Sequence, residues 1–247
     1  MSKSSPRILL LDIETAPIIA HVWKLWDQNV ALNQIEKDWF ILSWSAKWLD
    51  EKEVFYKDLR GKVKKGCDKA LLKPLYKLLN ECDIVLHQNG KKFDVPKINA
   101  RLVINGFKPP SPYRQIDLRD IVKKNFGFTS GKLEYITHTL NKKYKKQKHN
   151  KFAGHELWTE CLKDNPKAWA EMEKYNKYDV LALEEAYKIL RAWDSSINFD
   201  VYHDSLNNVC SCGSSHLKKN GYHYTNNGKM ERFRCKSCGR TFASKRN

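Results

Sequence analysis

The feature that most constrains this chain is a nearly continuous apolar run close to its start. Residues 7–13 read Arg-Ile-Leu-Leu-Leu-Asp-Ile, so hardly any position in the run is suited to face water. A strand of this kind is covered on both faces, whereas a strand at a solvated surface alternates between apolar and polar residues. The run therefore predicts a buried strand with other structure packed above and below it.

Strand and helix patterns follow one another along the first 200 residues. The last helix has the clearest start, because Asn165 suits a helix cap and Pro166 suits the first helical position. Strands with interleaved helices, followed by a helical half, indicate an α/β domain. Further strands are expected at 39–48, 53–59, 83–87 and 115–118, and helices at 68–80, at 94–105 and from 166 to 193.

Composition limits the class of protein. The chain has 247 residues, which suits one ordinary domain with a small appendage or two small domains. Its apolar content of 41% is enough for a core and excludes a disordered chain. No apolar run approaches the roughly 20 residues that a membrane helix needs, and the start of the chain lacks the apolar core of a signal peptide. We therefore expect a soluble, cytoplasmic protein without a membrane partner.

The charge balance points to a polyanionic partner. The formal net charge is +17, and the first 200 residues and the last 47 both carry an excess of Lys and Arg. Such a surplus raises the local concentration of polyanions, of which nucleic acid is the most obvious. The alternative is a basic protein with no such partner.

Acidic residues stand at three places that suit metal binding. Asp12 and Glu14 are two apart at the end of the first strand, so they point to the same face and repel each other unless a cation lies between them. Asp94 opens a helix after a polar turn, and Asp179 lies four residues after Tyr175 on one helix face. Taken singly, each has an ordinary alternative: a strand running out into solvent, a helix cap, and an amphipathic helix with its Asp in water.

The three motifs together resemble the DnaQ-like exonucleases. Asp-x-Glu on a first strand, Asn-x3-Phe-Asp after a later strand and Tyr-x3-Asp on a C-terminal helix are that family's pattern. The resemblance covers about residues 7–193 and implies an RNase H-like fold with a mixed five-stranded sheet flanked by helices. Lys174 occupies the position of the histidine in one branch, and Tyr175 matches the tyrosine (DEDDy) branch, which includes the proofreading domains of family B DNA polymerases. The segments LLLDIETAP, HQNGKKFDVPKINAR and YNKYDVLALEEAY also resemble predicted phage and bacterial exonucleases of the YprB type.

The resemblance implies a metal-dependent 3′→5′ exonuclease. Two Mg²⁺ or Mn²⁺ ions would activate water and stabilise the leaving oxygen, and such hard cations prefer oxygen ligands. Asp12 would bridge the two ions. Tyr175 would orient the attacking water rather than act as a base, because the ordinary pKa of tyrosine is near 10. The implied metal ligands are Asp12, Glu14, Asp94 and Asp179.

Substrate contacts are expected around these motifs, with single-stranded 3′ ends as the preferred partner. By resemblance, Ile13, Glu14 and Thr15 would form the floor of a pocket for the terminal nucleotide. Asn89 and Phe93 would contact the strand, although Phe93 also suits core packing. Residues 142–151 are rich in lysine and form either a solvated loop or a strip that follows the phosphates. Its lysines proposed as substrate-binding are Lys142, Lys143, Lys145 and Lys146.

Four of the seven cysteines are grouped near the C-terminus and predict one structural Zn²⁺. Cys235 and Cys238 have the spacing of a zinc knuckle, whereas Cys210 and Cys212 are one residue tighter than usual. His203 or His216 is an alternative to Cys210. The segments CGSSHLKKNG and RFRCKSCGRTF resemble the zinc ribbons of transposases, and basic charge favours nucleic-acid capture over a purely structural or docking role. The expected division is an exonuclease domain at 1–196, a linker at 197–208 and a zinc ribbon at 209–247.

Other functions remain open from the sequence. The same metal site serves a structure-specific endonuclease, and a binding protein without catalysis is a further alternative. DNA and RNA are not distinguished, protein partners are not predicted, and the cell is expected to be bacterial or phage-infected. Residues 22–28, Val-Trp-Lys-Leu-Trp-Asp-Gln, contain two tryptophans that belong either to the core or to the lining of the substrate pocket.

Overall fold

The apolar run near the start of the chain forms β1 (Ile8–Thr15), which lies in the middle of a five-stranded sheet. This arrangement comes from a computed structural model that describes residues 6–145, 151–197, 199–202 and 208–244. β1 runs antiparallel to one neighbour and parallel to the other, so the sheet is mixed, as expected. The strand order is β5 (Phe55–Asp58), β4 (Ile41–Trp48), β1, β6 (Ile84–His87), β7 (Arg114–Asp117).

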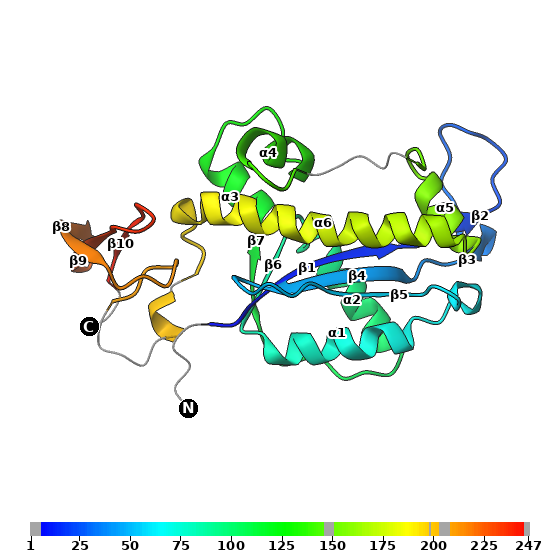
Figure 1. Cartoon of the computed structure of the whole chain (residues 1–247), viewed down its shortest axis with the longest axis horizontal. Coiled ribbons are helices and arrows are strands. Elements are labelled where there is room, and N and C mark those ends of the chain that lie inside the picture. The colour runs from blue at the N-terminus through cyan, green and yellow to red at the C-terminus, as the bar shows by residue number, and fades with distance from the viewer. Residues whose placement is uncertain (1–5, 146–150, 198, 203–207, 245–247) are drawn as a thin grey trace.

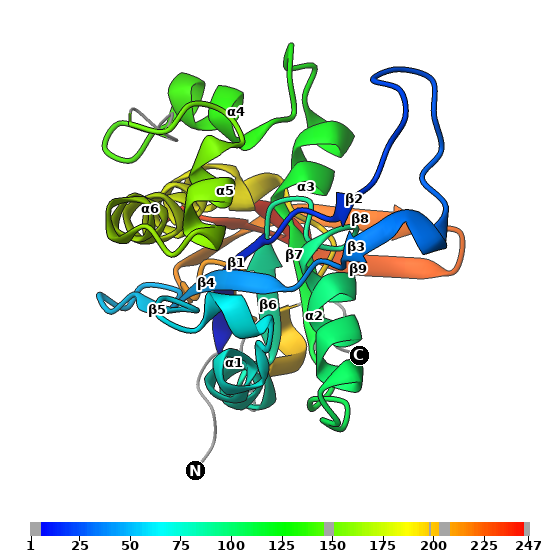
Figure 2. The same ribbon diagram turned by 90° about the vertical axis from the view of Figure 1, so that its right-hand side faces the viewer.

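Helices cover both faces of this sheet (Figure 1). In Figures 1 and 2, α1 and α2 lie on one face, and α6 lies on the other with α3 beside it. The predicted α/β fold, a mixed five-stranded sheet flanked by helices, is therefore confirmed. The helices are α1 (Lys69–Glu81), α2 (Asp94–Ile104), α3 (Leu118–Asn125), α4 (Leu133–Leu140), α5 (Glu156–Leu162) and α6 (Pro166–Leu190), with short 3-10 turns η1 (Leu32–Gln34), η2 (Val63–Lys65), η3 (Arg191–Trp193) and η4 (Phe199–Tyr202).

The side chains of β1 alternate between two apolar clusters. Leu9 and Leu11 join the cluster that contains the buried leucines of α1. Ile8 and Leu10 join a second cluster, which contains Val180 of α6. Because strand side chains alternate with a period of two, the next residues of the second set, at positions 12 and 14, also point toward the α6 side.

The long helix α6 begins where the sequence predicts. The side chain of Asn165 accepts a hydrogen bond from the backbone N–H of Lys167 at 3.0 Å, and Pro166 occupies the first turn, where no intrahelical N–H bond is lost. The helix has 25 residues and is about 37 Å long at about 1.5 Å per residue. It crosses most of the sheet and therefore reaches both ends of β1.

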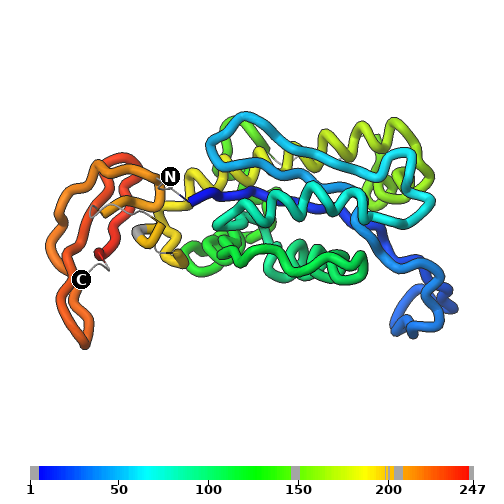
Figure 3. Tube along the Cα trace, turned by 90° about the horizontal axis from the view of Figure 1, so that it is seen from below, coloured from blue at the N-terminus to red at the C-terminus, as the bar shows by residue number. Residues whose placement is uncertain are grey.

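Two smaller elements lie at opposite ends of the molecule's long axis, as Figures 1 and 3 both show. At one end, β8 (Leu217–Thr225), β9 (Gly228–Cys235) and β10 (Thr241–Ala243) form a three-stranded sheet. At the other, beyond the carboxyl end of β1, β2 (Ile19–Ala20) pairs with β3 (Ile35–Lys37). Ile197 and Phe199, which fall in the predicted linker, are buried in the second core cluster, and the domain boundaries stay a prediction.

A buried ion pair joins β4 to α6. The ammonium of Lys47, whose side chain is only 3% exposed, lies 2.9 Å from a carboxylate oxygen of Glu184. The other oxygen of Glu184 accepts the backbone N–H of Asp50 at 2.9 Å and lies 2.9 Å from Lys188, which is more exposed. In the described residues, no helix is both long and apolar enough to cross a membrane.

Removing Glu184 is expected to destabilise the fold strongly. Glu184→Ala leaves the Lys47 ammonium buried without its carboxylate, which costs about 3–5 kcal/mol in the free energy of unfolding. The matched variant Lys188→Ala removes the exposed partner of the same carboxylate and is expected to cost less than about 1 kcal/mol. Urea unfolding of both variants measures the difference, and equal losses would contradict a role for the buried pair.

Candidate functional site

Three of the four predicted carboxylates meet between β1 and α6. Carboxylate oxygens of Asp12, Glu14 and Asp179 lie within 4.8 Å of one another. Asp179 is buried, and the two β1 residues are half-buried. The alternation of β1 and the packing of α6 against the same face produce this meeting, because each element is fixed by its own apolar neighbours.

This group of oxygens suits a hard divalent cation. Carboxylates this close repel one another when ionised, and a cation between them removes the repulsion. The donor set contains only oxygen, which Mg²⁺ and Mn²⁺ prefer over nitrogen or sulfur. The chemistry of the residues therefore fits the predicted metals.

Asp94 lies beside these three but is turned onto the backbone of β1. Its Oδ1 accepts a hydrogen bond from the backbone N–H of Ile13, the residue between Asp12 and Glu14, at 3.1 Å. Burial raises the pKa of Asp94 to about 6, although the N–H of Ile13 acts in the opposite direction. Asp94 is the first residue of α2 rather than its cap, a position that Phe93 occupies.

The turn before Asp94 is held by a second buried network. The backbone N–H of Gly90 donates to Nδ1 of His87 at 3.1 Å, and a Cβ at position 90 would come within 2.4 Å of the imidazole. Asp117 accepts the N–H of Asn89 at 2.8 Å, and Asn89 has a φ of +63°, which asparagine tolerates better than most residues. The network fixes the path of the chain into α2, and with it Asp94.

Asn176 joins the two elements that carry the carboxylates. Its Nδ2 donates to Oδ2 of Asp12 at 2.5 Å, and its Oδ1 accepts from the hydroxyl of Ser43 on β4 at 3.2 Å. Asn176 is fully buried. The sequence analysis missed this residue, although its position three before Asp179 places both on one helix face.

Trp158 of α5 is a second residue that the sequence analysis missed. Its indole N–H donates to Oε2 of Glu14 at 2.9 Å. Its ring also packs edge-on against Tyr175, with 6.2 Å between ring centroids and an interplanar angle of 79°. Trp158 therefore bridges Glu14 and Tyr175, and no motif in the sequence marks it.

The residues predicted to contact substrate are spread around the carboxylates. Ile13 is buried and Thr15 half-buried, at an irregularity in the pairing of β1 with β4. The side-chain oxygen of Asn89 accepts from Arg119 at 2.5 Å. Phe93 is 39% exposed, and the ammonium of Lys97 lies 5.1 Å from its ring centroid. The substrate roles of these residues stay predictions.

The lysine-rich segment is attached to α6 close to Asp179. Backbone N–H groups of Lys142 and Tyr144 donate to the carboxylate of Glu185, each at 2.8 Å. The ring of Tyr144 packs edge-on against Tyr178, the residue before Asp179. Lys142, Lys143 and Lys145 are exposed, and Lys146 lies outside the described residues.

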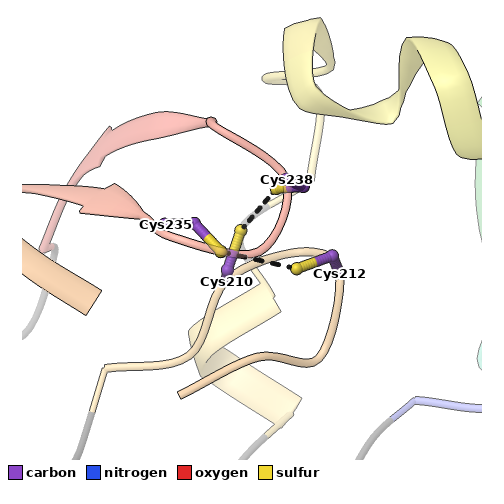
Figure 4. A group of neighbouring side chains, drawn as sticks. All are labelled: Cys210, Cys212, Cys235 and Cys238. Carbon is purple, nitrogen blue, oxygen red and sulfur yellow. Dashed lines mark hydrogen bonds between the residues drawn. The ribbon is translucent and has the colours of Figure 1, made fainter. Parts of the chain in front are cut away.

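The four C-terminal cysteines form one cluster (Figure 4). Their sulfur atoms lie within 4.8 Å of one another. Cys210 and Cys238 are 3.5 Å apart and Cys212 and Cys235 are 3.6 Å apart, well beyond the roughly 2.05 Å of a disulfide. The arrangement is compatible with a zinc ribbon. Of the two alternative ligands, His216 is exposed and His203 lies outside the described residues.

Backbone donors favour the thiolate at one of the four cysteines, Cys235, whereas burial raises the pKa of the Cys210 and Cys212 thiols. Burial raises the pKa of the Cys235 thiol, but the N–H groups of Cys238 and Ser237 lower it, to about 6. Zn²⁺ binds the thiolate form of cysteine. The donor set of four sulfurs therefore fits zinc in both number and chemistry.

Comparison with known proteins places the main domain in a family. The model of the RNase_H superfamily matches residues 9–191, so this chain belongs to the RNase_H superfamily. Membership supports a nuclease that acts on nucleic acid. A search of the curated proteins finds no match.

Among solved structures, the chain resembles the family B DNA polymerase from the hyperthermophilic archaeon Pyrobaculum calidifontis. The two share 14% sequence identity with a TM-score of 0.47. The match covers 90% of this chain and 31% of the polymerase chain, so the chain spans about a third of that protein.

Truncation of Asn176 is expected to weaken divalent-metal binding. Asn176→Ala frees the carboxylate of Asp12 to turn, and loss of such a supporting hydrogen bond typically lowers metal affinity about 10- to 100-fold. Calorimetric titration with Mn²⁺ measures the change. Lys177→Ala, which removes an ion pair with Glu173 on the same helix, is the control and is expected to keep the wild-type affinity. Equal affinities in all three proteins would mean that Asn176 does not position Asp12.

Proposed function

We propose that this chain is a metal-dependent 3′→5′ exonuclease of the tyrosine branch of the DnaQ-like group. The observation that carries the proposal is the meeting of Asp12, Glu14 and Asp179 at one site, with Asp94 bonded to the backbone between the first two. Superfamily membership supports nuclease chemistry in general. The 3′→5′ direction of cleavage rests on the Tyr-x3-Asp motif, by which the sequence resembles the DnaQ-like exonucleases.

The chain's own residues divide the proposed reaction among them. Asp12, Glu14, Asp94 and Asp179 would hold two Mg²⁺ or Mn²⁺ ions. When bound, these ions supply the positive charge that activates water and stabilises the leaving oxygen. Asn176 holds Asp12 in place, and Trp158 holds Glu14. The exposed lysines at 142, 143 and 145 attract the phosphates of the strand.

Tyr175 orients the attacking water in this proposal. The edge-on contact with Trp158 restricts its ring, and Trp158 is itself bonded to Glu14. A neutral phenol both donates and accepts hydrogen bonds, so it can hold a water molecule without removing its proton. Its removal therefore weakens orientation while the carboxylates still hold metal.

The first test is a time course with 5′-labelled single- and double-stranded DNA and RNA in Mg²⁺ or Mn²⁺. We expect a ladder that shortens from the 3′ end and is abolished by EDTA and by Asp12→Ala. Tyr175→Phe is expected to lose roughly 100-fold in kcat, as when one oriented hydrogen bond is removed from a transition state, and less than Asp12→Ala.

Each alternative function has its own outcome in this experiment. Discrete internal cuts would replace the exonuclease by a structure-specific endonuclease on the same site. Binding without cleavage by folded, metal-loaded wild type would replace it by a binding protein. Equal losses of kcat in Tyr175→Phe and Asp12→Ala would contradict separate roles for the phenol and the carboxylates.

The proposal also includes one structural Zn²⁺, separate from the ions at the carboxylates. It would be held by Cys210, Cys212, Cys235 and Cys238 in a C-terminal ribbon, and this ribbon would capture nucleic acid. The small sheet offers few buried apolar residues, and zinc supplies the stability that so small a core lacks. The strands of the ribbon carry basic residues, which suits phosphate binding.

Zinc content is expected to depend on the four clustered cysteines and not on the total number of cysteines in the chain. Wild type should contain one zinc per chain by mass spectrometry of metals, and Cys235→Ser much less, because a thiolate ligand is lost. Cys67→Ser removes an exposed cysteine outside the cluster and should keep full zinc. Full zinc in Cys235→Ser would rule out the four-sulfur site.

A further inference from the structure

Among the residues that the structure describes, the most exposed large apolar side chains lie in one loop. Residues 21–34, here called the tryptophan loop, connect β2 to β3. Trp23 is 88% exposed, Leu25 86% and Trp26 79%. Tryptophan is normally largely buried, because water solvates its large apolar ring poorly. The sequence analysis left the core and the pocket lining open for these tryptophans, and their exposure excludes the core.

The loop has an internal hydrogen-bonded structure. The backbone N–H of His21 donates to the carbonyl of Gln34, and the amide of Gln34 returns a bond to the carbonyl of His21, both at 2.9 Å. The side-chain amide of Gln28 bonds to both backbone groups of Lys24. These bonds hold a turn that carries the two indole rings outward instead of letting them collapse onto the sheet.

The tryptophan loop leaves the sheet at the end where the carboxylates lie. Glu14 and Trp23 are nine residues apart, which limits their separation to about 30 Å even in a fully extended chain. Figure 2 looks onto this end and shows the loop projecting away from the body beside β2 and β3. The zinc-ribbon sheet lies at the other end of the long axis (Figure 3).

A second pair of aromatic rings, joined by one lysine, lies in the segments that follow the loop and precede Asp94. Trp39 follows β3 by two residues, and the ammonium of Lys97 lies 3.7 Å from its ring centroid. The same ammonium reaches the ring of Phe93, which precedes Asp94. Two partly exposed rings and a cation thus lead from the site toward the base of the loop.

We propose that the tryptophan loop binds unpaired nucleobases of the strand whose 3′ end lies at the carboxylates, and that its indole rings do so by stacking. This rests on the nuclease function proposed above. Stacking on tryptophan accepts any base, so it requires no particular sequence in the strand. The net charge of +17 and the lysines near Asp179 supply the attraction for phosphate that the rings lack.

The charges of the loop favour a nucleobase over a lipid surface. Lys24 and Asp27 carry opposite charges, so the turn presents no cationic face to anionic lipid. Stacking needs no net charge on the turn, because phosphate is attracted elsewhere on the protein. The preferred substrate is consequently a single strand long enough to reach from the carboxylates to the loop.

The test compares Trp23→Ala/Trp26→Ala with a matched control, Val103→Ala/Ile104→Ala. The control residues are also exposed and apolar but lie at the far end of α2 from Asp94. Binding of a 5′-labelled 15-nucleotide strand is measured by anisotropy without added divalent metal. We expect a Kd at least about 10-fold higher for the tryptophan variant, since stacking is worth roughly 5- to 150-fold per base, and a wild-type Kd for the control.

Further variants and substrates separate stacking from other causes. Trp23→Phe/Trp26→Phe keeps an aromatic face and should recover most of the binding, whereas leucine at both positions should not. Hydrolysis of a trinucleotide, which offers fewer bases to the indole rings, should be affected less than hydrolysis of the 15-nucleotide strand. If the tryptophan variant loses as much affinity for a blunt duplex as for a single strand, base stacking is overturned.

The failure of this proposal differs from the failure of the nuclease. If wild type binds strands without cutting them, and the tryptophan variant loses this binding, the role of the loop is supported and the nuclease function is excluded. Cleavage by wild type with an unchanged Kd in the tryptophan variant overturns the loop's role alone. The same unchanged Kd, together with tryptophan-dependent sedimentation on phosphatidylcholine–phosphatidylserine vesicles, would assign the loop to a membrane surface.

Discussion

The alternation of β1 is the constraint on which the rest of the structure depends. One set of its side chains is locked into the core on the α1 side, and the other, Ile8 and Leu10, is locked against α6. The same period then directs Asp12 and Glu14 toward α6. Because α6 is held on this face by Val180 and its neighbours, Asp179 arrives opposite them. Core packing thus fixes the spacing of the carboxylates.

Gathering acids in this way opposes folding, and the surrounding residues reduce the cost without removing it. Asn176 donates to Asp12, Trp158 to Glu14, and the backbone of Ile13 to Asp94. Each donor stabilises negative charge, yet none carries a positive charge that would neutralise it. Such a site is less stable than an apolar one of the same shape, and sites of this kind persist where function requires them.

The sequence predicted those features that are local or periodic. A continuous apolar run identified β1, the Asn165–Pro166 pair identified the start of α6, and two-residue spacing placed Asp12 and Glu14 on one face. It did not predict Asn176 or Trp158, whose partners are 164 and 144 residues away, because such contacts depend on tertiary packing. The exposure of Trp23 was also invisible, since an apolar residue ordinarily indicates burial.

In the proposed function, the two ends of the molecule would contact different parts of a bound strand. Asp179 lies eleven residues before the end of α6, about 16 Å along its axis, and the chain then turns toward the cysteine cluster. A pocket lined by Arg7 and Cys212 shows that this cluster adjoins the start of β1, opposite the tryptophan loop. In Figure 1, α6 runs along the long axis between these two places, and its Glu185 fixes the lysine-rich segment. In the proposed function, the cysteine cluster would retain a long substrate at one end, and the loop would hold bases at the end of the sheet where the carboxylates lie.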